Sequence, residues 1–547
     1  METPLSPIEF ARRSRKLHGA REAVVDGALR LTYEQFGERC DRWSAALSKL
    51  GVQQGDRVGT ISRSTHQHLE QFYAIPQLGA VIVPMNYRLT ADDFVYLADH
   101  SGCKVLCVDV DYLDVVNRVR DRMPGVKHFV ALEGRQAGWL EYESLLAGSD
   151  VEFARPEIEE TDLLAINYTS GTTAKPKGVM ITHRNAWINV VGTIAHWPMT
   201  PADRYLWTLP MFHANGWTFT WIVTAVGGTH ICLRKAEASA IYEEIQRERV
   251  TTLCAAPTVL IAIANGPEAQ RKQLRRGVRL LTAGAPPAAV TIERIEGELG
   301  WHVTQVYGLT ETAPFISICV PLPEHEDLTQ AQRAAIKARQ GVELMTSGEL
   351  RVVDQDLRDV PQDGATVGEI VARGNVVMRG YFNDPEATAL AFAGGWFHSG
   401  DAAVVHPDGY IEIRDRFKDV IISGGENISS IEVESALLRH PAVLEVAVVG
   451  IPHEKWGESP KAFVVLAEGH APDASTAQSI FQHCRERLSP YKRIRRLEFA
   501  ALPKTISGKI RRVDLRNAEH GRAAGDSRHP REFWEEDLPA IDSRSRP

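Results

Sequence analysis

The sequence predicts an α/β protein with a large N-terminal domain and a small α+β C-terminal domain. Three observations lead to this fold class. At 547 residues the chain is too long for one ordinary core. Helical and strand-like stretches alternate from residue 1 to about 340, which indicates parallel sheets. From about residue 345 the strands become shorter and turns more frequent, which indicates a small β-rich module.

The individual elements follow from local patterns in chain order. Apolar residues at helical spacing predict a helix over 32–50, and short apolar runs predict strands over 80–84 and 163–166. A further apolar run predicts a strand over 278–282, which ends in the turn segment 283–287. In parallel α/β sheets, ligands gather at the loops beyond such strand ends.

The C-terminal domain begins where the pattern changes again, at about residues 415 to 418. A charged stretch over 414–419 precedes a predicted strand over 420–422, and Ser429 with Glu432 fits a helix capping box. We therefore expect an N-terminal domain over 1–415 and a C-terminal domain over 416–547. The polar tail over 520–547 is expected to pack loosely.

Composition excludes several classes of function. A net charge of -8 argues against general nucleic-acid binding, and no apolar run is long enough to span a bilayer. The first residues lack the apolar centre of a secretory signal, so a cytoplasmic location is expected. The seven cysteines are an odd number without a paired metal-site spacing, and we interpret them as structural.

The segment 168–178, Tyr-Thr-Ser-Gly-Thr-Thr-Ala-Lys-Pro-Lys-Gly, lies between two predicted strands, and the second covers 179–181. Glycines let the backbone approach an anion, while hydroxyls and lysines add donors and positive charge. The expected ligand is a polyphosphate. The segment is not the P-loop pattern, because Pro176 stands where that pattern needs glycine. A plain Ser/Thr/Gly-rich turn is the alternative.

Four further motifs extend this interpretation. They are Gln-Val-Tyr-Gly-Leu-Thr-Glu-Thr over 305–312, Gly-Trp-Phe-His-Ser-Gly-Asp over 395–401, the charged and glycine-containing run over 414–426, and Pro-Lys-Thr-Ile-Ser-Gly-Lys-Ile-Arg over 503–511. In this order and spacing, together with the segment 168–178, they resemble the adenylate-forming superfamily. Its members include acyl-CoA synthetases, aryl-CoA ligases, adenylation domains and luciferases. The resemblance covers about residues 5 to 515.

The resemblance implies a two-step reaction that uses ATP, Mg²⁺ and CoA. A carboxylate attacks the α-phosphate of ATP and forms an acyl-adenylate with release of pyrophosphate. A thiol then attacks the acyl carbon and releases AMP. The first step depends mainly on positioning and charge neutralisation.

The resemblance also assigns nucleotide contacts to individual residues. The β- and γ-phosphates are assigned to Thr169, Ser170, Gly171, Thr172, Thr173 and Lys177. The adenine is assigned to Gly284, Ala285 and Pro286, with Gln305, Tyr307 and Gly308 alongside. Thr310 resembles the α-phosphate contact and Glu311 the Mg²⁺ ligand, for which a carboxylate is chemically suited. Asp401 and Arg416 resemble the two ribose contacts; for Asp401 the alternative is a helix or turn cap.

Three features of the C-terminal region complete the expected site. Lys509 resembles the adenylation lysine, whose charge bridges the carboxylate and the α-phosphate; a surface lysine in a basic tail is the alternative. Lys418 occupies the family's hinge position, and Gly424 and Gly425 match the loop that enters the site after the C-terminal domain rotates. Two departures, Ala174 for glycine and Ser507 for threonine, are mild and leave charge unchanged.

The acid substrate is expected to lie near the segment 210–217, Pro-Met-Phe-His-Ala-Asn-Gly-Trp. This motif resembles the acyl pocket of medium-chain fatty and aryl acid ligases. It places His213 near the carboxylate or at a gate for the second step, with an ordinary core histidine as the alternative. Trp217 and its aromatic neighbours either shape the pocket or belong to the core.

Several alternatives stay open at the level of sequence. The acceptor is expected to be CoA, with a carrier-protein thiol as the second candidate. Luciferase-type oxygenation is remote. A catalytically silent scaffold is disfavoured because Lys509, Glu311 and Asp401 are all present. A homodimer is left open.

Overall fold

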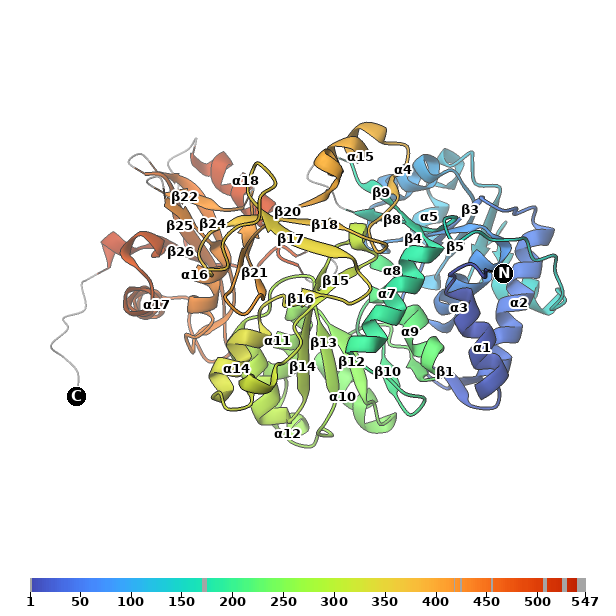
Figure 1. The fold of residues 1–547 in the computed structure, drawn as a ribbon, viewed down its shortest axis with the longest axis horizontal. Coiled ribbons are helices and arrows are strands. Elements are labelled where there is room, and N and C mark those ends of the chain that lie inside the picture. The colour runs from blue at the N-terminus through green and yellow to red at the C-terminus, as the bar shows by residue number, and fades with distance from the viewer. Residues whose placement is uncertain are drawn as a thin grey trace.

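The computed structural model describes residues 2–169, 175–417, 419–423, 426–453, 456–504, 509–523 and 529–538. Four sheets organise the described chain, and the α/β class predicted from the sequence is confirmed. Figure 1 places the N-terminal helices at one end of the molecule and the C-terminal sheet with its helices at the other, with the four-stranded sheet between them.

An eight-stranded sheet contains both strands that flank the Ser/Thr/Gly-rich segment. Its parallel part runs from β8 through β4, β3, β5 and β6 to β7, while β9 and β19 pair antiparallel. Its strands, in spatial order, are β19 (Gly380–Tyr381), β9 (Lys177–Thr182), β8 (Leu163–Thr169), β4 (Val81–Met85), β3 (Arg57–Ile61), β5 (Cys103–Val108), β6 (His128–Ala131) and β7 (Leu140–Glu141). The strands predicted over 80–84 and 163–166 are thus confirmed as β4 and β8.

A nine-stranded sheet lies below it in Figure 1 and contains the strand predicted over 278–282. Its central strands are parallel, and both edges are antiparallel. Its strands, in spatial order, are β16 (Val342–Glu343), β15 (Phe315–Ile318), β14 (His302–Gly308), β13 (Arg279–Thr282), β12 (Thr252–Ala255), β10 (Arg204–Leu206), β11 (Thr229–Ile231), β1 (Glu22–Asp26) and β2 (Leu29–Thr32).

Helices connect and cover these two sheets. The helix predicted over 32–50 is observed as α2, and the Thr32 hydroxyl and the Gln35 side chain form a reciprocal capping box at its start. The helices are α1 (Ile8–His18), α2 (Tyr33–Lys49), α3 (His66–Ala74), α4 (Ala91–Ser101), α5 (Leu113–Asn117), α6 (Tyr142–Ala147), α7 (His183–His196), α8 (Ala214–Trp217), α9 (Phe219–Val226), α10 (Ala238–Arg247), α11 (Pro257–Asn265), α12 (Glu268–Arg271), α13 (Ala289–Arg294), α14 (Gln330–Lys337) and α15 (Pro385–Ala391). The largest apolar core draws side chains from both sheets and from the four-stranded sheet.

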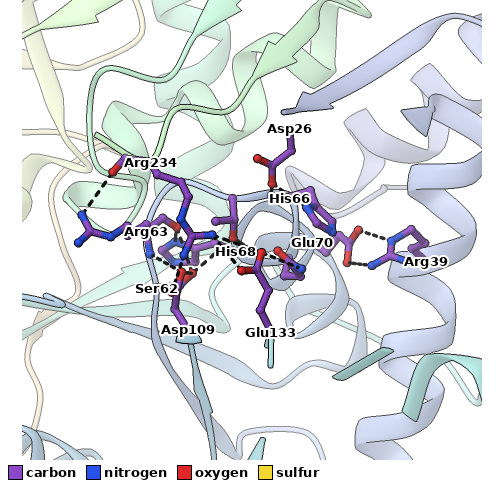
Figure 2. A network of polar contacts seen from close by, with 12 residues as sticks. Asp26, Arg39, Ser62, Arg63, His66, His68, Glu70, Asp109, Glu133 and Arg234 are labelled. Carbon is purple, nitrogen blue, oxygen red and sulfur yellow. Dashed lines mark hydrogen bonds and ion pairs between the residues drawn. The ribbon is translucent and has the colours of Figure 1, made fainter. Parts of the chain in front are cut away.

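A network of ion pairs joins the two large sheets, as Figure 2 shows. Arg234, which follows β11, lies 2.7 Å from Asp109 at the end of β5 and 3.1 Å from Glu133 after β6. His66 at the start of α3 lies 2.7 Å from Asp26 at the end of β1. Because the side chain of Asp109 is almost fully buried, its charge needs this partner. The network therefore restrains one sheet against the other beside the loops at their strand ends.

The β-rich module expected after residue 345 is a four-stranded antiparallel sheet. Its strands are β17 (Glu349–Val353), β18 (Gly368–Arg373), β20 (Phe397–Val405) and β21 (Ile411–Arg416). The next strand, β22, already belongs to a separate C-terminal sheet. The boundary expected at about 415 to 418 lies at this change of sheet, and the division into a large N-terminal domain and a mobile C-terminal domain stays a prediction.

The C-terminal sheet has its own apolar core. Its strands are β22 (Ile421–Ser423), β23 (Glu426–Ile428), β24 (Val443–His453), β25 (Gly457–Leu466), β26 (Arg496–Phe499) and β27 (Glu532–Trp534). Its helices are α16 (Ser430–Leu437), α17 (Ala474–Arg487) and α18 (Arg512–Ala523).

Two details of the C-terminal region differ from expectation. The Ser429 hydroxyl caps α16 by accepting from the Glu432 N–H, but the Glu432 carboxylate binds Lys492 at 2.7 Å and does not complete a capping box. Within the tail expected to pack loosely, β27 pairs antiparallel with β26. The reason is that Glu532 lies 3.2 Å from Lys461, a fully buried cation that also binds Glu498 and Glu519.

All seven cysteines are buried and none forms a disulfide, which agrees with a structural role. Cys103 and Cys107 lie in β5, where burial raises the pKa of the Cys103 thiol to about 11. Among the described residues, the helices are all too short or too polar to cross a bilayer.

Candidate active site

The two predicted ribose contacts lie on neighbouring strands. Asp401 in β20 pairs directly with Arg416 in β21, and the Arg416 Nε lies 3.1 Å from Asp401 Oδ1. The Tyr307 hydroxyl, at the end of β14, donates to Asp401 Oδ2 at 2.8 Å. Asp401 is only 4% exposed, so the two partners fix the carboxylate in one orientation. Each carboxylate oxygen retains a lone pair that can accept a further hydrogen bond.

Glu311, the predicted Mg²⁺ ligand, lies in the short helix η5 (Thr310–Thr312) together with Thr310. The Tyr381 hydroxyl donates to Glu311 Oε1 at 2.9 Å, and the ring of Tyr381 lies 4.9 Å from Lys177 Nζ. Burial raises the pKa of Glu311, because the charged form loses hydration there. A cation beside Glu311 would offset this cost.

The donor set around Glu311 fits a Mg²⁺ ion that is bound jointly by the protein and the phosphates of a nucleotide. Among the described residues no group of three or more Asp, Glu, His or Cys side chains could hold a metal ion. Mg²⁺ needs no such cage, since it is commonly held by one or two carboxylates together with substrate phosphates and water. Glu311 would supply the carboxylate, and the bound ion would neutralise phosphate charge.

The predicted adenine segment follows a strand of the nine-stranded sheet. Gly284, Ala285 and Pro286 follow the carboxyl end of β13, and β14 runs parallel beside it with Thr282 opposite Gln305. Gln305 is 2% exposed, and its Oε1 has no hydrogen-bond partner within the described part of the chain.

Gly308 has a packing reason of its own. A Cβ at this position would lie 1.8 Å from the carbonyl oxygen of Pro314. Glycine is therefore required by the close approach of the backbone after β14, whether or not Gly308 contacts a nucleotide.

Of the predicted phosphate-binding residues, the structure describes the two that end the strands. Thr169 at the end of β8 pairs with Lys177 at the start of β9. Ser170, Gly171, Thr172 and Thr173 lie outside the described residues, as do Lys418, Gly424 and Gly425.

Helix α4 contacts both strand ends. The Tyr96 hydroxyl donates to the carbonyl oxygen of Pro176 at 3.2 Å, next to β9. His100 Nδ1 lies 2.7 Å from the hydroxyl of Tyr168 in β8, and burial lowers the pKa of His100, which favours the neutral ring as acceptor. These contacts fix the strand ends that bear Thr169 and Lys177.

His213 precedes an unusual backbone segment in the predicted acyl pocket. Residues 214–218 all have positive φ angles, between 37° and 70°. Left-handed turns cost roughly 1–2 kcal/mol per non-glycine residue. Asn215 supports the turn, because its Oδ1 accepts from Asn167 Nδ2 at 3.2 Å and its carbonyl accepts from the Thr220 hydroxyl at 3.0 Å. Such local strain commonly marks a functional site.

Lys509 reaches this site from the C-terminal region. Burial and the nearby charge of Arg416 lower its pKa to about 8. Burial and the charge of Lys509 lower the pKa of His213 to about 4. The lysine therefore lies close enough to act electrostatically on the predicted ribose contacts with Tyr307, called here the ribose corner (Tyr307, Asp401 and Arg416), and on His213.

The predicted ribose contacts, the predicted Mg²⁺ carboxylate, the predicted acyl-pocket histidine and Lys509 converge on one place. Together with the fold, this arrangement defines the class of adenylate-forming enzymes. The model described as AMP-binding enzyme matches residues 10–382, and that described as AMP-binding enzyme C-terminal domain matches residues 432–509. The chain belongs to this family of AMP-binding enzymes.

Individual proteins similar to the chain agree with this assignment. Acetate/butyrate–CoA ligase AAE7, peroxisomal, of Arabidopsis thaliana is 41% identical over 94% of this chain and 94% of its own length. Trans-cinnamate:CoA ligase, peroxisomal, of Petunia hybrida is 38% identical, also over 94% of both. The crystal structure of the anthranilate CoA ligase AuaEII with anthranoyl-AMP superimposes with a TM-score of 0.87 at 26% identity, covering 96% of this chain and 100% of that one.

Sequence reasoning missed three residues that the structure places beside the site. Tyr381 contacts both Glu311 and Lys177, and Tyr96 and His100 contact the ends of β8 and β9. Tyr381 follows a glycine in a two-residue strand, and so short a strand has no recognisable sequence pattern. Tyr96 and His100 lie four residues apart on α4, so they share one face of the helix.

Proposed function

We propose that this chain is an AMP-forming ligase that joins a short-chain aliphatic carboxylic acid to CoA. Family membership accounts for the use of ATP, Mg²⁺ and CoA. The observation that carries the proposal is the position of Lys509, a partly buried cation that lies within electrostatic reach of both Arg416 and His213. Lys509, Arg416 and His213 are distant in sequence, and their proximity supports the resemblance to the adenylate-forming superfamily.

In the first half-reaction, a carboxylate oxygen of the acid forms a bond to the α-phosphorus of ATP, and pyrophosphate leaves. Asp401 accepts hydrogen bonds from the ribose, while Tyr307 and Arg416 hold it in place. Lys509 neutralises charge that develops between the carboxylate and the α-phosphate. Thr169 and Lys177 would contact the terminal phosphates, and Glu311 would hold Mg²⁺, which would neutralise phosphate charge.

In the second half-reaction, the CoA thiolate sulfur bonds to the acyl carbon, and AMP leaves with the bridging oxygen. The thiol proton passes to solvent or to a base. His213 is neutral at physiological pH because its pKa is about 4, so it can accept or donate a hydrogen bond without carrying charge.

The preference for short acids rests on Trp217. Its indole is 3% exposed and packs edge-to-face against Phe315 at 5.9 Å. A Cβ on Gly284 would lie 3.8 Å from Trp217 Cζ2, so the ring lies beside the predicted adenine segment. A bulky ring at this point favours acids such as acetate and butyrate over longer or aromatic acids. The acetate/butyrate relative is consistent with this preference, whereas the cinnamate relative makes aryl acids the second candidate.

The test is AMP release with acetate, butyrate, octanoate, benzoate and cinnamate, each with and without CoA. We expect CoA-dependent AMP release that is fastest with acetate or butyrate. Trp217→Gly should shift the optimum toward octanoate or cinnamate, and glycine suits the φ of 51° at this position. An optimum with benzoate or cinnamate in the unaltered chain would contradict the short-acid proposal.

Three further expectations remain proposals. Pyrophosphate release without turnover on CoA would indicate a carrier-protein acceptor. A homodimer is proposed as the alternative to a monomer. A cytoplasmic location is proposed from the sequence, although the two plant relatives are named peroxisomal.

A further inference from the structure

We propose that Asp415 and Glu434 are positioning residues that hold Lys509 in the adenylation site through helix α16. The inference rests on the proposed function, because it concerns the step that Lys509 performs. It adds a connected path from the four-stranded sheet to the lysine, made of three contacts in which buried or largely buried side chains take part.

The first contact joins β21 to α16. Asp415 is 2% exposed; its Oδ2 accepts from the backbone N–H of Ser430 at 2.8 Å, and its Oδ1 accepts from the N–H of Arg416 at 2.9 Å. Ser430 is the first residue of α16. Backbone N–H groups in the first turn of a helix lack internal partners, and the helix dipole favours an anion there. The Ser429 hydroxyl adds a hydrogen bond to the carbonyl of Arg414.

The second contact joins α16 to α18. Arg512 binds Glu434 through Nη2 at 2.6 and 2.8 Å and through Nε at 3.1 Å. The Val448 N–H donates to the same carboxylate at 2.8 Å. A forked guanidinium–carboxylate pair fixes orientation as well as distance. Arg512 opens α18 and lies three residues after Lys509.

The third contact joins α18 to the connection between the two sheets. Arg516 lies 2.6 Å from Asp419, and the Asp419 N–H donates to the carbonyl of Arg416 at 2.7 Å. Arg416 is itself the partner of Asp401. Helix α18 is thus held at two points, so Lys509 just before it is fixed relative to the ribose corner.

A rotation of the C-terminal domain would break the contact of Asp415 with α16 but would leave the pair of Glu434 with Arg512 intact. Asp415 lies in β21 of the four-stranded sheet, whereas Ser429 and Ser430 precede and open a helix that packs on the C-terminal sheet. The contact of Asp415 with α16 therefore breaks if the two sheets separate. The pair of Glu434 with Arg512 lies within the C-terminal region and moves with it. Asp415 consequently serves only the orientation that delivers Lys509.

The test measures the two half-reactions separately in the full chain. The first is acid-dependent pyrophosphate release from ATP and butyrate, and the second is CoA thioester formation from synthetic butyryl-adenylate. For Asp415→Asn we expect the first to fall by about tenfold or more, as expected for the loss of a charged hydrogen bond. The second should stay within about twofold, since no contact of Asp415 is needed for it.

A matched control and a milder variant keep the test sharp. Glu432→Gln alters the same helix, but its carboxylate contacts Lys492 and neither β21 nor α18, so both half-reactions should keep wild-type rates. Ser429→Ala should lower the rate of the first half-reaction by about threefold. This variant replaces Asp415→Asn in the test if Asp415→Asn folds poorly.

Equal losses in both half-reactions for a folded Asp415→Asn chain, or no loss in either, would overturn the inference. An unaltered chain that releases no pyrophosphate with any acid would instead count against the proposed function. The two failures are therefore distinguishable.

Discussion

The ribose corner and Lys509 are the two halves of the candidate site, and they are held in position in different ways. Asp401 and Arg416 are paired residues of adjacent strands, so the backbone hydrogen bonds of one sheet fix their separation. Lys509 belongs to a segment associated with another sheet and depends on ion pairs of Arg512 and Arg516. The first half is preorganised by local structure, while the second half is assembled by side-chain contacts between parts of the chain.

This difference predicts that the two halves fail separately. Nucleotide binding should survive changes at the lysine, because the ribose corner does not depend on Lys509. Chemistry at the α-phosphate should not survive them, because the lysine supplies charge where charge develops.

The largest expected effect is that of Lys509→Ala. Acid-dependent pyrophosphate release should fall by about a hundredfold to a thousandfold, as for the loss of one transition-state donor. ATP binding, followed by calorimetry, and the melting temperature should change little. Lys504→Ala is the control, since Lys504 is a nearby cation that pairs with Glu445 at 2.5 Å. Wild-type pyrophosphate release by Lys509→Ala would show that the lysine has no role in adenylation.

A smaller effect is expected from pH. The pKa of Lys509 is lowered to about 8, so its ammonium carries charge below that pH and loses it as pH rises. The kcat/KM for pyrophosphate release should therefore fall by about tenfold per pH unit above pH 8. Lys509→Arg should move this alkaline limb upward, because a guanidinium stays protonated throughout. An alkaline limb at the same pH in Lys509→Arg would assign the titration to another group.

Much of the candidate site could be proposed from the sequence because its residues belong to continuous motifs. Asp401, Glu311 and Lys509 each lie in a short segment whose residue types indicate their chemistry, and the strands around them follow from apolar runs. The order of the motifs along the chain also predicted the family correctly, and the alternation of helical and strand-like stretches predicted the fold class.

The remainder depends on how distant segments pack. Two residues, Tyr381 and Tyr96, lie outside the motifs that suggested the function, and Asp415 lies within one but has no sequence signal for its contact. The contacts of Tyr381, Tyr96 and Asp415 join residues that are 70, 80 and 15 positions apart in the sequence, respectively. The ordered β27 was missed for a similar reason. Its stability comes from Lys461, a buried cation about 70 residues earlier in the chain that no local pattern connects to it.

The most direct test of the account follows one oxygen atom. Butyrate labelled with oxygen-18 in its carboxylate is incubated with the chain, ATP, Mg²⁺ and CoA, and the AMP is examined by mass spectrometry. If the carboxylate attacks the α-phosphorus, AMP should carry one oxygen-18 atom for each thioester formed. Thioester formation with unlabelled AMP, or with the label in pyrophosphate, would contradict the adenylate mechanism.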